Sequence, residues 1–202
     1  MDPLAIQAKF GDDYIADENT FRMGIDRRFT GPIARRFRGR RVLETCTGAG
    51  FTTIALAREA MHVVSVEIDL AHQTQALRNL DRAGLSSRVT LVLGDFLDSS
   101  VWEGLPDVDA AFLDPDWAVT GPAHVHRFLR SSTRPPADVL LERALQRTRN
   151  VALVLPPQLD LGELSRLPVH ERQKLFLAGS HELYCLYFGE LAEGDGESEL
   201  RV

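Results

Sequence analysis

Short apolar strands alternate with helical stretches along most of the chain, and this alternation restricts the fold more than any other feature. The pattern predicts strands at 41–45, 62–67, 89–93, 110–113, 151–155, 173–177 and 182–188. It predicts helices at 52–60, 70–83 and 137–147, with a loop and short helix around 96–102. Strands separated by helices form a parallel sheet with helices on both faces. The last two strands leave no room for a helix between them, so the final strand should run antiparallel.

The prediction is therefore an α/β fold with a Rossmann-like, seven-stranded, mostly parallel sheet. With 202 residues, 44% of them hydrophobic, the chain can fill one core, and we expect a single domain over residues 1–191. Residues 1–40 should form an N-terminal helical segment in which Pro32 opens a helix across residues 33–37, and 41–191 should form the core. The acidic residues 192–202 are expected to be a solvated, mobile tail.

Composition excludes several classes of protein. No apolar stretch approaches a membrane span and no signal peptide is recognisable, so a cytoplasmic location is expected. Cys46 and Cys185 are too few for a disulfide framework, and the six histidines show no metal-ligand spacing, so no metal is predicted. His124 and His126 are interpreted as loop or surface residues, and a role beside the substrate stays open for them.

Charge is unevenly distributed along the chain. The formal net charge of −6 argues against unspecific binding to a phosphate backbone, which requires a broad basic surface. Seven arginines nevertheless crowd residues 27–41. They either form the charged, solvent-exposed face of a helix or bind phosphate or RNA, and the sequence leaves both interpretations open.

A glycine turn follows the first predicted strand. Gly48 and Gly50 close the run from Val42 to Phe51, and a turn without Cβ atoms lets backbone N–H groups approach a ligand closely. Glu67 ends the second strand nineteen residues after Gly48, where a carboxylate can accept both hydroxyls of a ribose. The two features together predict a nucleoside pocket.

Two cofactors compete for that pocket, a dinucleotide and S-adenosylmethionine. A glycine-rich turn that binds pyrophosphate usually has a third glycine or alanine where this chain has Thr53. Glu44, just ahead of the turn, would repel a pyrophosphate but could hold the ammonium of a methionine moiety, directly or through water. The carboxylates therefore favour the cationic cofactor.

Four motifs occur in order at suitable intervals: Glu44 with Gly48 and Gly50, Glu67, Asp95-Phe96, and Asp114-Pro115-Asp116-Trp117. The set resembles class I S-adenosylmethionine-dependent methyltransferases, and it is most similar to the trimethylguanosine synthase family of RNA cap guanine-N2 methyltransferases. The similarity extends from about residue 9 to residue 191, including the stretches 21–26, 153–156 and 183–191. In the fourth motif Asp116 stands where the family has a second proline.

The resemblance implies roles for individual residues. S-adenosylmethionine would be bound by Glu44, Thr45, Gly48, Gly50, Glu67, Asp95, Phe96 and Asp114. Asp114 and the Pro115 carbonyl would accept the N–H groups of an amine, and Trp117 would stack on the base that carries it, so these three are the candidate catalytic residues. Each also has a structural interpretation: Trp117 can fill a core, Asp114 can cap a helix, and Asp95 can form an Asx turn.

The resemblance implies an S-adenosylmethionine-dependent N-methyltransferase acting on an exocyclic amine, with guanine N2 of RNA or a cap-like nucleotide as acceptor and residues 1–40 on the acceptor side. Two alternatives remain. The acidic charge and Asp116 favour N-methylation of a small metabolite or a protein side chain, and a non-catalytic protein that binds S-adenosylmethionine is also consistent. The expected partner is the methyl acceptor alone, with no membrane and no evident protein partner.

Overall fold

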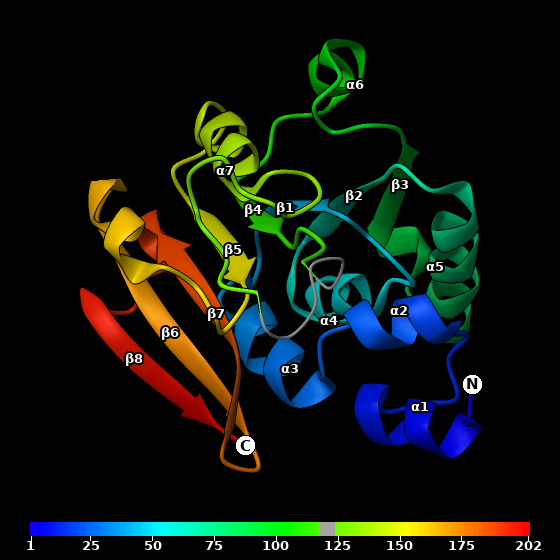
Figure 1. Ribbon diagram of the computed structural model, residues 1–202. Helices are drawn as coiled ribbons and strands as arrows, with labels where there is room; N and C mark the ends of the chain where they lie inside the picture. The colour runs from blue at the N-terminus through cyan, green and yellow to red at the C-terminus, as the bar shows by residue number, and fades with distance from the viewer. Residues whose placement is uncertain (118–123) are drawn as a thin grey trace. The chain divides into compact units, whose positions relative to one another are not determined.

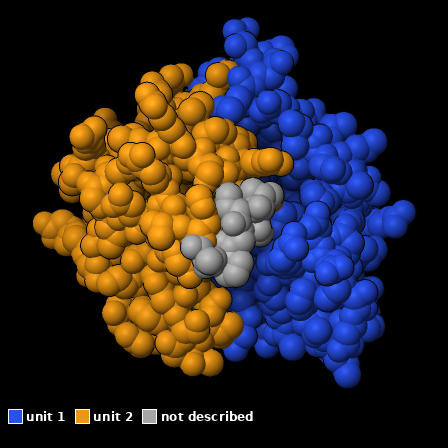
Figure 2. Space-filling model, viewed as in Figure 1, with its two compact units in different colours: residues 1–108 blue, residues 109–202 orange. Residues whose placement is uncertain are grey.

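The structure is a computed structural model that describes residues 1–117 and 124–202 (Figure 1). Its residues group into two compact units, residues 1–108 and residues 109–202 (Figure 2). Each unit contains strands and helices, so the fold is α/β, as predicted.

The first unit, all of whose residues are described, carries three parallel strands in the order β3, β2, β1. Its elements are α1 (Pro3–Phe10), α2 (Glu18–Met23), α3 (Arg27–Arg35), β1 (Arg41–Thr45), α4 (Phe51–Glu59), β2 (His62–Glu67), α5 (Leu70–Arg82), the 3-10 turn η1 (Ser86–Arg88), β3 (Val89–Leu93) and α6 (Ser99–Gly104). The bounds of all three strands agree with the prediction, because each is a short apolar run between turn residues.

Both faces of this three-stranded sheet meet helices. Val89 and Leu91 of β3 pack against the core that includes Ile54 of α4 and Leu80 of α5. Successive strand residues point to opposite faces, and Val92 accordingly lines a cavity of about 360 Å³ that residues of α6 also line.

Helix α3 begins earlier than predicted, and Pro32 lies inside it instead of opening it. Asp26 sets the start, because its carboxylate accepts a hydrogen bond from the backbone N–H of Arg28 at 2.9 Å. The same carboxylate takes two further bonds from the Arg28 guanidinium, Nε–Oδ1 2.8 Å and Nη2–Oδ2 2.7 Å. Although burial opposes ionisation, these bonds hold the pKa of Asp26 below its usual value. Part of the arginine-rich segment is therefore structural.

The second unit contains five strands among its described residues, in the order β4, β5, β7, β6, β8. Its elements are β4 (Ala110–Leu113), α7 (Ala137–Leu145), β5 (Val151–Leu155), the 3-10 turn η3 (Leu161–Arg166), β6 (His170–Leu177), β7 (Ser180–Phe188), the 3-10 turn η4 (Gly189–Leu191) and β8 (Gly196–Arg201). Strand β5 runs parallel to β4 and antiparallel to β7, so the predicted antiparallel strand is confirmed. No helix in the described part of the chain has both the length and the apolar character to cross a membrane.

The strand count of seven was wrong, because the segment expected to be a mobile tail contains an eighth strand. Strand β8 pairs parallel with β6 (Figure 1). Glu197 forms ion pairs with Arg172 (2.6 Å) and with Lys174 on β6, and the Ser198 hydroxyl donates to the buried Glu171 at 2.5 Å. The acidic residues of the tail are thus partly neutralised by basic residues of β6, a pairing that the composition of the tail alone does not reveal.

Candidate functional site

The glycine turn of the first unit lies between β1 and α4. Cys46, Gly48 and Gly50 all have left-handed backbones, with φ of 61°, 56° and 82°. A Cβ on Gly48 would meet nothing within 4 Å, so there is open space beside the turn for a ligand. A Cβ on Gly50 would lie 3.1 Å from the Cβ of Ala76 on α5, so packing as well as conformation favours glycine there.

Glu67 contacts the glycine turn directly. Its Oε2 accepts from the N–H of Gly48 at 2.8 Å, and its Oε1 accepts from the N–H of Asp69 at 2.9 Å. The side chain is 5% exposed. An ionised carboxylate has about four acceptor positions, so Glu67 can fix the turn and still accept from ribose hydroxyls.

Glu44 is almost completely buried. It is 1% exposed, its Oε2 accepts from the Ser65 hydroxyl at 2.7 Å, and that hydroxyl lies 2.6 Å from the Thr47 hydroxyl in the turn. Burial raises the pKa of Glu44 to about 7. The carboxyl therefore changes charge near neutral pH, and Ser65 and Thr47 connect it to the turn.

Sequence reasoning missed Ser65 and Thr47. The signal that could have found Ser65 is its register, because it is the β2 residue directly opposite Glu44 on β1. A small hydroxyl beside a buried carboxylate satisfies one of its lone pairs.

Three other predicted cofactor residues differ in accessibility. Thr45 is completely buried, and its hydroxyl has no hydrogen-bond partner in the described part of the chain. Asp95 is exposed and its Oδ1 accepts from the N–H of Leu97 at 2.8 Å, which makes the Asx turn. The Phe96 ring is 3% exposed and packs edge-on against Trp102 of α6, with ring centroids 5.4 Å apart. The open turn, the ribose-compatible Glu67 and the exposed Asp95 fit a nucleoside cofactor.

In the second unit, the Asp-Pro-Asp-Trp motif follows β4 immediately. Pro115 is buried, whereas Asp114, Asp116 and Trp117 are partly exposed. The backbone of Asp116 pairs with Arg134: the N–H of each residue donates to the carbonyl of the other at 2.8 Å. Proline has no N–H, so the residue that departs from the family pattern makes a hydrogen bond that the family's proline could not make.

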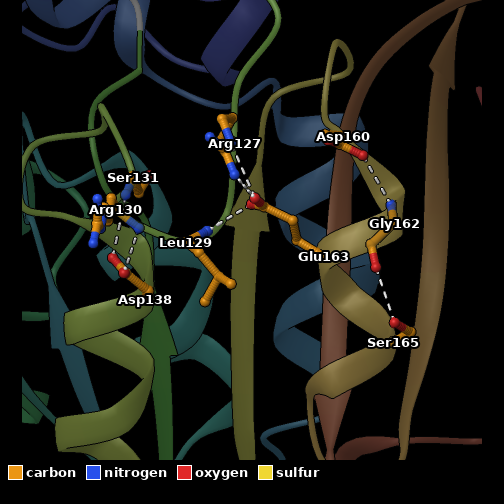
Figure 3. A network of polar contacts seen from close by, with 9 residues as sticks. All are labelled: Arg127, Leu129, Arg130, Ser131, Asp138, Asp160, Gly162, Glu163 and Ser165. Atoms are coloured by element: carbon orange, nitrogen blue, oxygen red, sulfur yellow. Dashed lines mark hydrogen bonds and ion pairs between the residues drawn. The ribbon is translucent and has the colours of Figure 1, made fainter.

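The loop that leads to Arg134 is anchored by two acidic side chains (Figure 3). Glu163 accepts from the N–H of Leu129 at 2.8 Å and from Arg127 Nε at 2.9 Å. Asp138, near the start of α7, accepts from the N–H of Arg130 at 2.8 Å. These contacts hold the loop that pairs with the motif, and no sequence motif pointed to Glu163 or Asp138.

The two histidines that follow the motif lie close together. Ser132 Oγ is 3.4 Å from His124 Nε2 and 3.4 Å from His126 Nδ1, and the two imidazole rings meet edge-on with centroids 4.7 Å apart. His126 is 2% exposed, so it is a buried loop residue: the prediction of a loop or surface residue holds for the loop and is wrong for the surface. Burial, with the neighbouring His124, lowers the pKa of His126 and favours its neutral form.

A mostly parallel α/β fold with an open glycine turn after its first strand is common to dinucleotide-binding proteins and methyltransferases. A family match over residues 39–190 assigns the chain to the class I S-adenosylmethionine-dependent methyltransferases. Within that class, the matching family model is that of RNA cap guanine-N2 methyltransferases, and the chain belongs to this family. S-adenosylmethionine is its methyl donor, as predicted.

Other methyltransferases are similar to part or most of the chain. A catechol O-methyltransferase of Niastella koreensis is 35% identical over 95 residues, covering 44% of this chain and 43% of the relative. The structure of an inferred methyltransferase from Porphyromonas gingivalis W83 has a TM-score of 0.73 at 20% identity, covering 94% of this chain and 48% of that one. The O-methyltransferase TomG from Streptomyces achromogenes, solved with S-adenosylmethionine, has a TM-score of 0.59 at 17% identity, covering 87% and 91%. The matches to the first two proteins span less than half of their lengths.

Proposed function

We propose that the protein methylates an exocyclic amine and that its acceptor is guanine N2 in RNA or in a cap-like nucleotide. The observation that carries this proposal is the Asp114-Pro115-Asp116-Trp117 motif directly after β4, in a chain whose residues 39–190 match the RNA cap guanine-N2 methyltransferase family. The motif supplies a carboxylate, a carbonyl and a flat ring within four consecutive residues.

Methyl transfer requires these residues mainly to position the acceptor. Bound S-adenosylmethionine supplies an electrophilic methyl group. Asp114 and the Pro115 carbonyl accept the two N–H groups of the amine and so direct its lone pair, and Trp117 stacks on the base, which is worth about 1–3 kcal/mol. An amine is neutral before it reacts, so no base has to remove a proton first. After transfer the methylated amine carries an excess proton. The carboxylate of Asp114, which accepts an N–H of the same amine in this proposal, can take up that proton.

The cofactor residues have complementary roles in this proposal. Glu67 and the turn at Gly48 and Gly50 bind the ribose end, Asp95 accepts from the adenine amino group, and Phe96 lends its backbone N–H. Glu44 and Thr45 lie at the end of β1, and we propose that Glu44 holds the methionine ammonium in its ionised form.

We propose that residues 1–191 form one catalytic domain, because the match to the family model, residues 39–190, runs through both compact units. We also propose that the enzyme works in the cytoplasm. Neither Cys46 nor Cys185 forms a disulfide in the described part of the chain, which is compatible with a reducing compartment.

A second candidate is methylation of a small molecule. The match to a catechol O-methyltransferase favours it, as does Asp116 at a position where the family has proline. A hydroxyl acceptor, unlike an amine, must lose its proton during transfer, so it requires a base. His124 is the exposed titratable side chain that follows the motif most closely among the described residues, and it would be the candidate base.

The experiment that separates the candidates is a transfer assay with labelled S-adenosylmethionine and a panel of acceptors. The panel should hold a capped RNA, a cap-like guanine nucleotide, catechol and the protein alone. Asp114→Ala serves as the chemically impaired control, because it should retain cofactor binding and lose most of the transfer rate. Label in catechol alone would reject the guanine proposal.

A further inference from the structure

A small cavity lies between α3 and α4 in the first unit. Its volume is about 110 Å³. One face of α3 lines it through Arg27, Thr30, Gly31 and Ala34, which have helical spacing, and one face of α4 lines it from Phe51 to Glu59. The cavity therefore lies along the arginine-rich segment, which the cofactor site does not use.

The floor of the cavity is apolar. Phe10 of α1 stacks face to face on Phe51, with ring centroids 3.5 Å apart and an interplanar angle of 10°. Ile25 and Ile54 complete this floor, and both are buried. Such surroundings exclude water from one side of a bound group, which strengthens its electrostatic contacts at the other side.

The polar lining carries an excess of positive charge. Arg58 lies 3.5 Å from the Tyr14 hydroxyl, measured from Nη2, and Arg27 makes no ion pair with any residue that the structure describes. Glu59 is the one acidic lining residue, and it is already paired with Arg38 at 2.8 Å. Two guanidinium groups and a phenol hydroxyl, all hydrogen-bond donors, thus remain for an anion.

Gly31 leaves room in the middle of the cavity wall. A Cβ at this position would meet nothing within 4 Å, although the residue is inside a helix, where glycine costs about 0.5–1 kcal/mol relative to alanine. A larger side chain at Gly31 would therefore extend into the cavity and occupy it.

We propose that this cavity binds a phosphate group of the methyl acceptor, gripped by Arg27, Arg58 and the Tyr14 hydroxyl. Guanidinium groups match phosphate oxygens in geometry and charge. The size of the cavity suits a phosphate group better than a whole nucleoside. The proposal rests on the proposed function only in assigning the phosphate to the acceptor, as a backbone phosphate of RNA or a phosphate of a free nucleotide.

The test measures binding, not methyl transfer. The probes are inorganic phosphate, sodium acetate, a short single-stranded RNA and a neutral peptide nucleic acid of the same bases, titrated against the full chain with amide chemical shifts and fluorescence anisotropy as readouts. The variants are the double substitution Arg27→Gln with Arg58→Gln, and Gly31→Leu, which blocks the cavity without changing charge. Arg35→Gln is the matched control, because Arg35 is an exposed arginine on α3 that does not line the cavity.

We expect phosphate to shift the amides of Thr30 and Gly31, and acetate to shift them less. RNA affinity should fall about tenfold or more in the double variant and in Gly31→Leu. The salt dependence in the double variant should lose about one unit of slope, because both arginines contact the same phosphate. Arg35→Gln should stay within about twofold of wild type.

Binding of phosphate without RNA would support the site and identify a free nucleotide as its source. Equal losses in Arg35→Gln and the double variant, or full affinity in Gly31→Leu, would overturn the proposal. Absence of phosphate binding would also overturn it. Failure of guanine methylation would leave all of these binding results unchanged, so the two proposals fail separately.

Discussion

Replacing Glu44 by glutamine should make the protein more stable at alkaline pH. The carboxyl is buried and its pKa is raised from 4.5 to about 7. The folded state therefore holds a proton that the unfolded state has lost between pH 4.5 and pH 7. Stability falls as pH rises through this window and is lowest above pH 7.

The magnitude follows from the size of the shift. Each pH unit of difference in pKa corresponds to about 1.4 kcal/mol, so ionising the buried Glu44 lowers the free energy of unfolding by about 3 kcal/mol between pH 4.5 and pH 7. Glutamine cannot ionise, and its amide oxygen can still accept from the Ser65 hydroxyl. Glu44→Gln should thus match wild type near pH 4.5, or fall slightly below it, and exceed it by a few kcal/mol at pH 8.

Urea denaturation from pH 4.5 to pH 8.5 measures this difference, with the free energy of unfolding extrapolated to water at each pH. Glu103→Gln, at an exposed glutamate on α6, is the control and should follow the wild-type curve. If the curves of Glu44→Gln and wild type run parallel across the whole range, the reasoning about the buried carboxyl is refuted.

Three further substitutions test single contacts. Glu67→Ala should weaken S-adenosylmethionine binding by about 1.5–3 kcal/mol. It should also lower the melting temperature, because two backbone N–H groups lose their acceptor. Calorimetry that shows unchanged affinity would contradict the ribose assignment. Asp116→Pro should destabilise the protein by about 1–3 kcal/mol, because it leaves the Arg134 carbonyl without its donor, whereas Asp116→Asn should not; equal melting temperatures would argue against this bond. Trp117→Phe should retain much of the acceptor affinity that Trp117→Ala loses, and equal losses would point to a structural tryptophan.

The sequence predicted the central strands well because their signals are local. Strands β1 to β5 have the predicted bounds, since each is a largely apolar run that has glycine, proline or a charged residue at its end or within the next three residues. The proximity of Glu67 to the glycine turn also followed from the sequence, because parallel strands carry their carboxyl ends to one edge.

The features that were missed depend on partners distant in the chain. Strand β8 forms because the acidic tail meets Arg172 and Lys174 of β6, and a composition rule for acidic segments contains no such information. The start of α3 is an exception, because its signal is local: Pro32 was preferred to the capping Asp26, which lies six residues earlier. His126 is buried where its backbone pairs with that of Leu159, a partner distant in the chain.

The most direct test of the central claim locates the transferred methyl group. The protein is incubated with isotopically labelled S-adenosylmethionine and a capped RNA, the RNA is digested to nucleosides, and mass spectrometry identifies the labelled product. The account predicts label on the exocyclic amine of guanine, with transfer strongly reduced in Asp114→Ala at unchanged cofactor affinity. Label on a hydroxyl, or transfer to catechol but to no guanine acceptor, would contradict it.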